Sequence, residues 1–405
     1  MTTPIKTQSQ QQQQQHPTVL VTGAKNFLAA HIIDQLIAQG YRVLGTVRTR
    51  EKGEFYQSRY GSRNFIYEVV RPSNVFDSFT NVFAKHGKDI QYMVHTATPP
   101  FYHGPDPERD VIQPAVAAVT AVLKAAHAGG PNLLKVVVTS SIACVVPPGG
   151  ERARKKTYNE TVWNPVTLEE ASQSTSTAFF GARVFAEKAV WKFVRSEHPR
   201  FTVTTIQLPL ILGPPINDML YQHLRASNEF LLQLITDPQA ALAKWDDNKT
   251  GAPASLPPDH DPELHDPALL PYTFPFYIDV RDAAATHVRA LTNHGLDNKR
   301  CLSVGGRADT GGLVRALCEV CPEYVPYVGE ATLEALKKRE EEEEEGEGEG
   351  EGEGEEGQGY ARCDTSECRK NLGIEYRTLE TTIYDTVQRV RELERALAPG
   401  DLPSP

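Results

Sequence analysis

The sequence predicts an α/β protein with a Rossmann-like, doubly wound parallel sheet and a smaller C-terminal substrate-binding lobe. From about Thr18 onward, short β-branched runs alternate with longer segments of helical periodicity, which is the order typical of a parallel sheet. The first strand, turn, helix and second strand fit within about 30 residues, the size of a mononucleotide-binding unit. Strands are expected at 18–22, 41–47, 90–95, 134–140 and 201–208, and helices at 27–39, 111–127 and 178–196.

The composition is that of an ordinary globular protein of 405 residues, with 40% hydrophobic and 23% charged residues. Twelve glutamates lie between Glu340 and Glu356, so the net charge of −10 becomes about +2 without them (−10 + 12). This balance gives no basic footprint for nucleic acid. No apolar run reaches the roughly 20 residues of a membrane span, and no apolar stretch follows a basic N-terminus. We therefore expect no membrane association, a cytoplasmic location and reduced cysteines.

The chain divides into segments of different composition. Residues 1–17 form a polar poly-Gln tail that is expected to be disordered. Residues 18–215 are expected to form mainly the dinucleotide-binding domain, and residues 216–397 mainly the substrate lobe, with a segment near 276–292 returning to the Rossmann domain. Within the lobe we expect a surface loop or lid at 237–271, a disordered Glu/Gly insert at 338–359 and a closing amphipathic helix at 378–397.

The turn after the first strand has the position of a phosphate-binding turn. Gly23 stands at the first glycine position, and Asn26 and Ala29 stand at the second and third. Asn tolerates the positive φ that such a turn can require, and Ala still allows close packing of helix and strand. Backbone N–H groups at Phe27 and Leu28, where the helix begins, would then reach the pyrophosphate. The alternative interpretation is an ordinary strand–helix turn.

Basic residues follow the second strand, where an acidic residue would favour NAD. Arg48 ends that strand and Lys52 lies one turn further on. An arginine at this position accommodates the 2′-phosphate of NADP, so NADP(H) is the predicted cofactor. The alternative is a solvated basic surface loop.

Several motifs together resemble the extended short-chain dehydrogenases/reductases of the NAD-dependent epimerase/dehydratase superfamily. The similarity is to the dihydroflavonol reductase-like branch, which includes fungal aldehyde and ketone reductases. The stretches that carry the resemblance are VLVTGAKNFLAAHIIDQLIAQGYRVLGTVR from Val19, HTATPPF from His95, VVVTSSIA from Val136, FAEKAVWKF from Phe185 and FYIDVRDAAATH from Phe276.

The resemblance implies NADPH-dependent reduction of a small-molecule carbonyl, or oxidation of the alcohol, at a Ser–Tyr–Lys site. By motif, Ser141 is the active-site serine, Thr96, Ala97 and Thr98 line the cofactor, and Pro209 contacts its nicotinamide side. The oligomeric state stays open.

The sequence departs from the family at the catalytic Tyr and Lys. The YxxxK motif should precede FAEKAVWKF, but Phe179 occupies the Tyr position and Arg183 the Lys position. Phe179 cannot donate a proton, whereas Arg183 keeps the charge and could still bind ribose hydroxyls. Pro72 also stands where the family has an Asp that contacts adenine. Two hypotheses lead: a reductase with an atypical proton donor, for which Tyr158 and Tyr221 are alternatives, and a catalytically impaired cofactor-binding or scaffold protein. A third, an epimerase or dehydratase of the same superfamily, also relies on the missing Tyr and is less favoured than the first.

No metal site is predicted. The cysteines Cys318, Cys321, Cys363 and Cys368 could hold zinc, but their spacing matches no compact finger and thiols at helical spacing usually belong to a core. The Asp/His-rich stretch 259–266 is more typical of a solvated acidic loop.

Overall fold

The computed structural model describes residues 16–71, 75–97, 105–147, 156–216, 228–243, 275–345 and 361–396. Its main sheet has seven parallel strands in the order β10-β7-β5-β4-β1-β2-β3, so the doubly wound parallel sheet is confirmed. The strands are β1 (Thr18–Thr22), β2 (Arg42–Val47), β3 (Phe65–Val69), β4 (Ile90–His95), β5 (Lys135–Ser141), β7 (Thr202–Leu208) and β10 (Lys299–Leu302).

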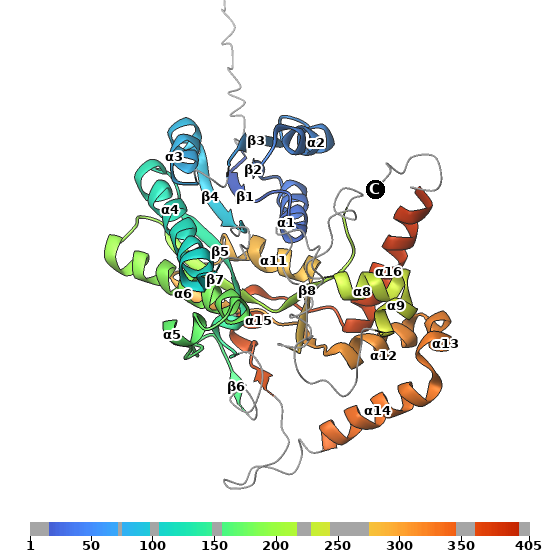
Figure 1. Ribbon diagram of the computed structural model, residues 1–405. Helices are drawn as coiled ribbons and strands as arrows, with labels where there is room; N and C mark the ends of the chain where they lie inside the picture. Colours follow the sequence, from blue (N-terminus) through green and yellow to red (C-terminus); the bar gives the residue numbers. More distant parts are fainter. Residues whose placement is uncertain are drawn as a thin grey trace, which may run out of the picture.

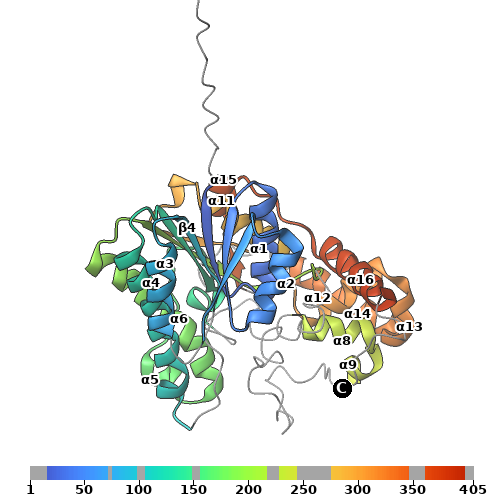
Figure 2. The same cartoon turned by 90° about the horizontal axis from the view of Figure 1, so that it is seen from above.

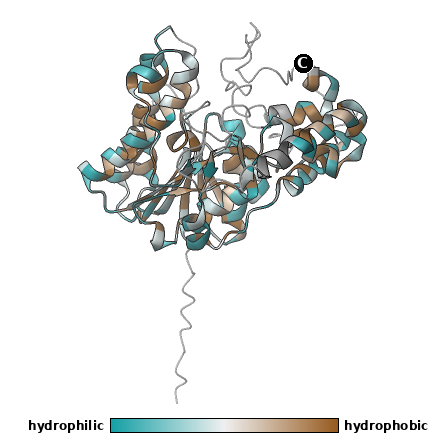
Figure 3. Cartoon of the chain, turned by 90° about the horizontal axis from the view of Figure 1, so that it is seen from below, coloured by the Kyte–Doolittle hydropathy of each residue, from teal (hydrophilic) through white to brown (hydrophobic). Residues whose placement is uncertain are grey.

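Helices cover both faces of this sheet (Figures 1 and 2). Alternate residues of β1 show the division: Val19 and Val21 pack on one side and Leu20 on the other, as the two-residue period of a strand requires. One face carries α1 (Phe27–Ala38) and α11 (Val280–Ala290), and the other carries α3 (Val75–His86), α4 (Gln113–Gly129) and α6 (Thr175–Glu197). At the β3 edge lies α2 (Arg50–Tyr60). The central strands are mainly hydrophobic, whereas the outer helices are mixed (Figure 3).

The C-terminal lobe has a separate hydrophobic core and lies beside the main sheet (Figure 1). Its helices are α8 (Glu229–Thr236), α9 (Pro238–Ala243), α12 (Thr310–Val320), α13 (Val325–Val328), α14 (Glu330–Glu345) and α16 (Leu379–Ala396). A small sheet of β8 (Leu210–Leu212), β9 (Phe276–Asp279) and β11 (Gly306–Arg307) connects it to the Rossmann domain. The remaining elements are α5 (Leu168–Ala171), β6 (Thr157–Tyr158), β12 (Arg362–Cys363) and α15 (Ser366–Leu372).

The structure corrects two expectations about irregular segments. The predicted loop at 237–271 begins with the helix α9, and the predicted Glu/Gly insert begins with the last turns of α14, which runs to Glu345. Glutamate is a good helix former, and Leu333 and Leu336 anchor the start of α14 against the lobe core. Residues 244–274 and 346–360, like the tail at 1–15, lie outside the described residues.

One helical stretch of the described residues, Glu108–Gly129, has the length and apolar composition of a membrane span. It was not predicted from the sequence, because its length depends on a π-helical turn at Glu108–Ile112 that joins α4 without interruption. The stretch packs against α3 and α6 on the sheet face, and part of its apolar surface is buried there. Its apolar residues therefore serve, at least in part, the core of the Rossmann domain.

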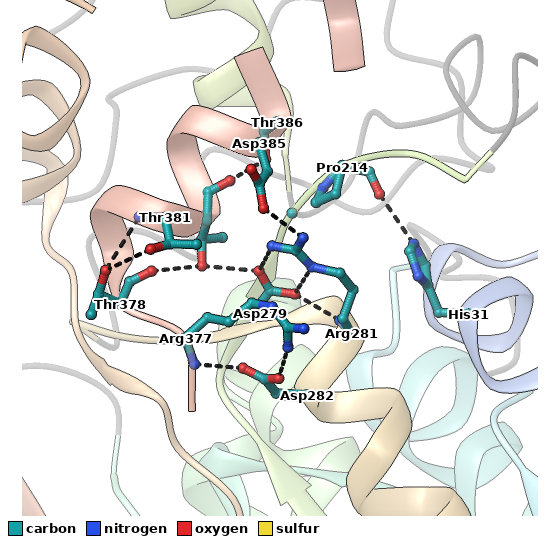
Figure 4. Close-up of polar contacts among 12 residues, drawn as sticks. His31, Pro214, Asp279, Arg281, Asp282, Arg377, Thr378, Thr381, Asp385 and Thr386 are labelled. Atoms are coloured by element: carbon teal, nitrogen blue, oxygen red, sulfur yellow. Dashed lines mark hydrogen bonds and ion pairs between the residues drawn. The ribbon is translucent and has the colours of Figure 1, made fainter. Parts of the chain in front are cut away.

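Ion pairs join the Rossmann domain to the lobe along one seam between α11 and α16 (Figure 4). The guanidinium of Arg281 contacts the buried carboxylate of Asp279 at 2.7 Å and that of Asp385, on α16, at 2.6 Å. Asp279 also accepts a hydrogen bond from Thr382 of α16 at 3.0 Å, and Asp282 pairs with Arg377. These contacts set how the lobe lies against the sheet.

Replacing Arg281 by Met is expected to lower the free energy of unfolding by about 3 kcal/mol, because it leaves the carboxylate of Asp279 buried without its cation. The matched control is Arg391→Met, which removes a more exposed pair with Glu323 and should cost at most about 1 kcal/mol. Chemical denaturation of both variants measures the difference. Equal losses in the two variants would contradict a structural role for the seam.

Candidate dinucleotide and active site

The carboxyl ends of β1 and β4 meet at the point where the strand order reverses. The chain runs from β1 outward to β2 and β3 on one side, and to β4, β5 and β7 on the other. In open α/β sheets, ligands bind outside the carboxyl ends of the strands at such a switch point. Gly23 follows β1 and Thr96 and Ala97 follow β4, so the structure brings these three predicted residues together.

Gly23 needs to be glycine. Its φ is +68°, a conformation that residues with a Cβ rarely adopt. An added Cβ would also lie 3.1 Å from Cα of Ala97. The turn is therefore compact enough for backbone groups to face a ligand directly.

Asn26 has an ordinary backbone conformation in the turn. Its φ is −76°, so it does not use the tolerance of Asn for positive φ, and that prediction was wrong. Instead Asn26 caps α1: its Oδ1 accepts a hydrogen bond from the N–H of Ala29 at 2.6 Å. Its Nδ2 donates to the hydroxyl of Thr96 at 2.9 Å and to the carbonyl of Thr96 at 3.2 Å. The side chain is thereby fixed between the two strand ends.

Capping by Asn26 leaves part of the first turn of α1 open. In the described part of the chain, the N–H groups of Phe27 and Leu28 have no hydrogen-bond acceptor. Two orphan donors at the positive end of a helix dipole, beside a tight glycine turn, form an anion-binding arrangement. The geometry thus suits a pyrophosphate.

The basic residues after β2 lie at the same edge of the sheet. Arg48 is half-buried directly after the strand, and Lys52 is half-buried in the first turn of α2. Arg50, between them, is exposed and pairs with Glu54 at 3.2 Å. Two cations and a helix N-terminus give this edge positive potential, which suits a second phosphate.

The predicted catalytic positions also lie close together. Ser141 ends β5, and its Oγ accepts a hydrogen bond from the N–H of Ala143 at 3.2 Å. Phe179 packs with Ile142 and Ala143 in one apolar cluster. The guanidinium of Arg183, one turn further along α6, lies 5.1 Å from the centre of the Phe179 ring, which is a cation–π contact.

The ring of Phe179 fills the Tyr position with hydrocarbon. It also meets the ring of Phe180 edge to face at 5.2 Å. Tyr158, one of the alternative proton donors, is buried in the same apolar cluster, and burial raises the pKa of its hydroxyl. Pro209 lies between β7 and β8, at the carboxyl edge of the sheet. Thr98, Pro72 and Tyr221 lie outside the described residues.

The alternative hypothesis, that four cysteines bind one zinc ion, is wrong because the structure does not bring them together. Cys318 and Cys321 belong to the core of the lobe, whereas Cys363 packs near β6 and Cys368 packs against the Rossmann sheet. The Sγ atom of Cys368 lies 2.7 Å from that of Cys301. Across the described ranges, no group of three or more His, Cys, Asp or Glu side chains could hold a metal ion.

Three polar residues behind the site were not predicted from the sequence: Glu187, Arg300 and Asn164. Glu187 and Asn164 are fully buried, and Arg300 is nearly so. The side chain of Asn164 donates to the carbonyl of Ala143 at 2.8 Å, next to Ser141. The only available signal was Glu187 in the helical stretch FAEKAVWKF, since an acidic residue on a buried helix face needs a partner.

The switch point, the glycine turn and the open helix N-terminus define a dinucleotide-binding Rossmann protein of the extended short-chain dehydrogenase/reductase class. The chain belongs to the NAD dependent epimerase/dehydratase family, whose model matches residues 19–227.

Curated relatives match nearly the whole chain. It is 31% identical to the NADPH-dependent methylglyoxal reductase GRE2 of Saccharomyces cerevisiae, over 93% of this chain and 99% of that protein. It is 29% identical to the ketoreductase azaE of Aspergillus niger, over 92% and 97%.

Solved structures agree with the fold. The crystal structure of yeast methylglyoxal/isovaleraldehyde reductase Gre2 complexed with NADPH superposes with a TM-score of 0.71 at 28% identity, covering 93% of this chain and 99% of that one. The complex of Gre2 with NADPH from Candida albicans gives 0.72 at 27% identity, with the same coverage.

Proposed function

We propose that this protein is an NADP(H)-dependent oxidoreductase that reduces aldehyde or ketone groups of small molecules, with a proton donor other than the usual tyrosine. The observation that carries the proposal is the switch-point site with Arg48 at the end of β2, in a chain that matches NADPH-dependent reductases over nearly its full length. A proton donor other than tyrosine is proposed because Phe179 stands at the Tyr position.

The residues at the site fit the cofactor. Gly23 lets the backbone approach the pyrophosphate, and the N–H groups of Phe27 and Leu28 would hold it. Arg48 and Lys52 would bind the 2′-phosphate. Thr96 and Ala97 would border the cofactor at the end of β4.

The bound cofactor would supply a hydride to the carbonyl carbon. Ser141 would hold the carbonyl oxygen by a hydrogen bond. Arg183 would hold positive charge near that oxygen and near the ribose, but a guanidinium does not give up a proton at neutral pH. Phe179 contributes only apolar surface, so the proton must come from another hydroxyl or from water.

A second candidate is a protein that binds the cofactor without turnover. The cation–π contact of Arg183 with Phe179 favours this candidate. The contact occupies the Tyr and Lys positions with a pair of side chains that has no ionisable hydroxyl. Binding would then serve a sensor or scaffold.

Binding of NADPH is expected to raise the melting temperature and to enhance nicotinamide fluorescence in a saturable way, whereas NADH should bind at least about ten-fold more weakly. Arg48→Asp should reverse this preference, because it places a carboxylate beside the 2′-position. The matched control is Arg195→Asp, an exposed arginine near the far end of α6. No response to either nucleotide would rule out the cofactor assignment. If NADPH does bind, turnover with a panel of aldehydes and ketones separates a reductase from a protein that only binds the cofactor.

A further inference from the structure

A buried ion pair lies directly behind the catalytic positions. The Nε of Arg300 donates to Oε1 of Glu187 at 2.8 Å, and the two side chains are only 9% and 2% exposed. Glu187 also accepts from Ser140 at 2.5 Å, from Thr205 at 2.8 Å and from Gln207 at 2.6 Å. We call these five residues the Glu187 cluster. It joins α6 to the carboxyl ends of β5 and β7 and to the edge strand β10.

Arg300 extends the cluster into two loops. Its terminal nitrogens donate to the carbonyls of Glu160 at 2.8 Å, Val162 at 2.5 Å and Cys144 at 3.2 Å. Its guanidinium also lies 3.7 Å from the ring centre of Trp163. One side chain thus holds the turn after β5 and the loop at 159–164.

The attached groups are the neighbours of the candidate site. Ser140 precedes Ser141, and Cys144 closes the short turn that follows it. Glu187 lies on α6 one turn after Arg183 and two turns after Phe179, on the same helix. The cluster therefore sets the position of the serine strand relative to the helix that carries the Tyr and Lys positions.

Charge alone does not explain this arrangement. A buried ion pair is weak evidence for stability, because well-packed apolar residues often replace one without loss. Four of the five guanidinium N–H groups have acceptors, and these lie on three segments: α6, the turn after β5 and the loop at 159–164. Such geometric specificity indicates a role in positioning.

We propose that Arg300, through Glu187 and the two loops, is a positioning residue that holds Ser141 and the 159–164 loop in place for the carbonyl substrate. The inference rests on the proposed function. It concerns the substrate side of the site, since the contacts of Arg300 reach neither the β1 turn nor Arg48.

Arg300→Lys tests the proposal. Lysine keeps a positive charge beside Glu187 but cannot reach several acceptors at once. We expect the KM for the best carbonyl substrate to rise by about ten-fold or more, while NADPH affinity changes by less than about two-fold. Tryptophan emission should also shift to longer wavelength and become easier to quench with acrylamide, because Trp163 loses the guanidinium and Trp191 loses a firmly held Glu187.

The matched control is Asp297→Asn. It weakens the pair of Lys135 with Asp297, 2.8 Å apart, which joins the amino end of β5 to the turn just before β10. This variant should leave KM and the tryptophan signals as in the wild type. If Arg300→Lys folds poorly, the double variant Glu187→Gln with Arg300→Gln removes both charges together and should show the same changes in KM and fluorescence.

Wild-type KM and unchanged tryptophan signals in either variant would overturn the proposal. So would equal changes in the Asp297→Asn control, since these would indicate a general loss of stability. If the wild type binds NADPH but reduces no carbonyl compound, the proposed function fails. Tryptophan emission and quenching in Arg300→Lys then still decide whether Arg300 holds the 159–164 loop. An unchanged tryptophan signal would overturn that role of Arg300.

Discussion

The double variant Phe179→Tyr with Arg183→Lys is expected to reduce carbonyl compounds about 10²- to 10⁴-fold faster than the wild type, because that is the usual contribution of a general acid. The backbone already places position 179 in α6 beside the turn after Ser141. Adding one hydroxyl to a half-buried ring is a small change in volume. The compact ammonium of lysine can lie beside the phenol oxygen and lower its pKa through its charge, whereas the guanidinium of Arg183 lies over the face of the ring.

The single variants are the controls for this experiment. Phe179→Tyr alone leaves Arg183 over the ring, and Arg183→Lys alone supplies no acid, so each should give a much smaller gain than the pair. Turnover is measured from NADPH oxidation with an aldehyde and a ketone. A fall below the wild-type rate in the double variant would mean that the wild-type site already has an effective proton donor. That outcome would contradict the proposal of a protein that binds the cofactor without turnover.

Acidification from pH 6.5 to 4 is expected to destabilise the fold by roughly 3 kcal/mol for each of three buried histidines, by linkage. Burial lowers the pKa of His31, His95 and His287 from 6.5 to about 4. The unfolded chain therefore binds protons before the folded chain does. The stability due to the neutral rings is fully present above pH 6.5 and is lost as the pH falls toward 4.

The hydrogen bonds of these histidines require neutral imidazole rings. The Nδ1–H of His287 donates to the carbonyl of Ala283 at 2.7 Å, so its Nε2 is left to accept from Thr139 at 2.9 Å. His31 donates from Nε2 to the carbonyl of Pro214 at 3.1 Å, at the seam with the lobe (Figure 4). Each neutral ring is thus satisfied without a counter-ion.

Urea denaturation between pH 7 and 4 measures this dependence. His287→Gln should show a shallower loss of stability with acid, because one of the three titrating groups is gone. The exposed His127→Gln is the matched control and should follow the wild-type curve. Parallel curves for the two variants would contradict the assignment of the acid sensitivity to buried histidines.

Local pattern was enough to predict the sheet and the position of the cofactor turn. β-branched runs gave β1 and β4 with their observed bounds, and the strand–turn–helix order placed Gly23 at the switch point. These features depend on residues close together in the chain, where the period of apolar side chains and the freedom of glycine act directly. The replacement of Tyr and Lys by Phe179 and Arg183 could also be read from one short segment.

The tertiary structure decided what depends on distant partners. The cap of α1 by Asn26 is itself a local contact with Ala29, but the hydrogen bond that ties the same side chain to Thr96 joins residues some seventy positions apart. The sequence shows at most that Glu187 needs a partner. The role of the pair depends on the donors and acceptors around Glu187 and Arg300, which come from β5, β7, β10 and the turn after β5. Sequence by itself thus determined the fold class and the chemistry missing at position 179. Only the folded chain determined how the remaining groups are held, because contacts between distant segments leave no local pattern.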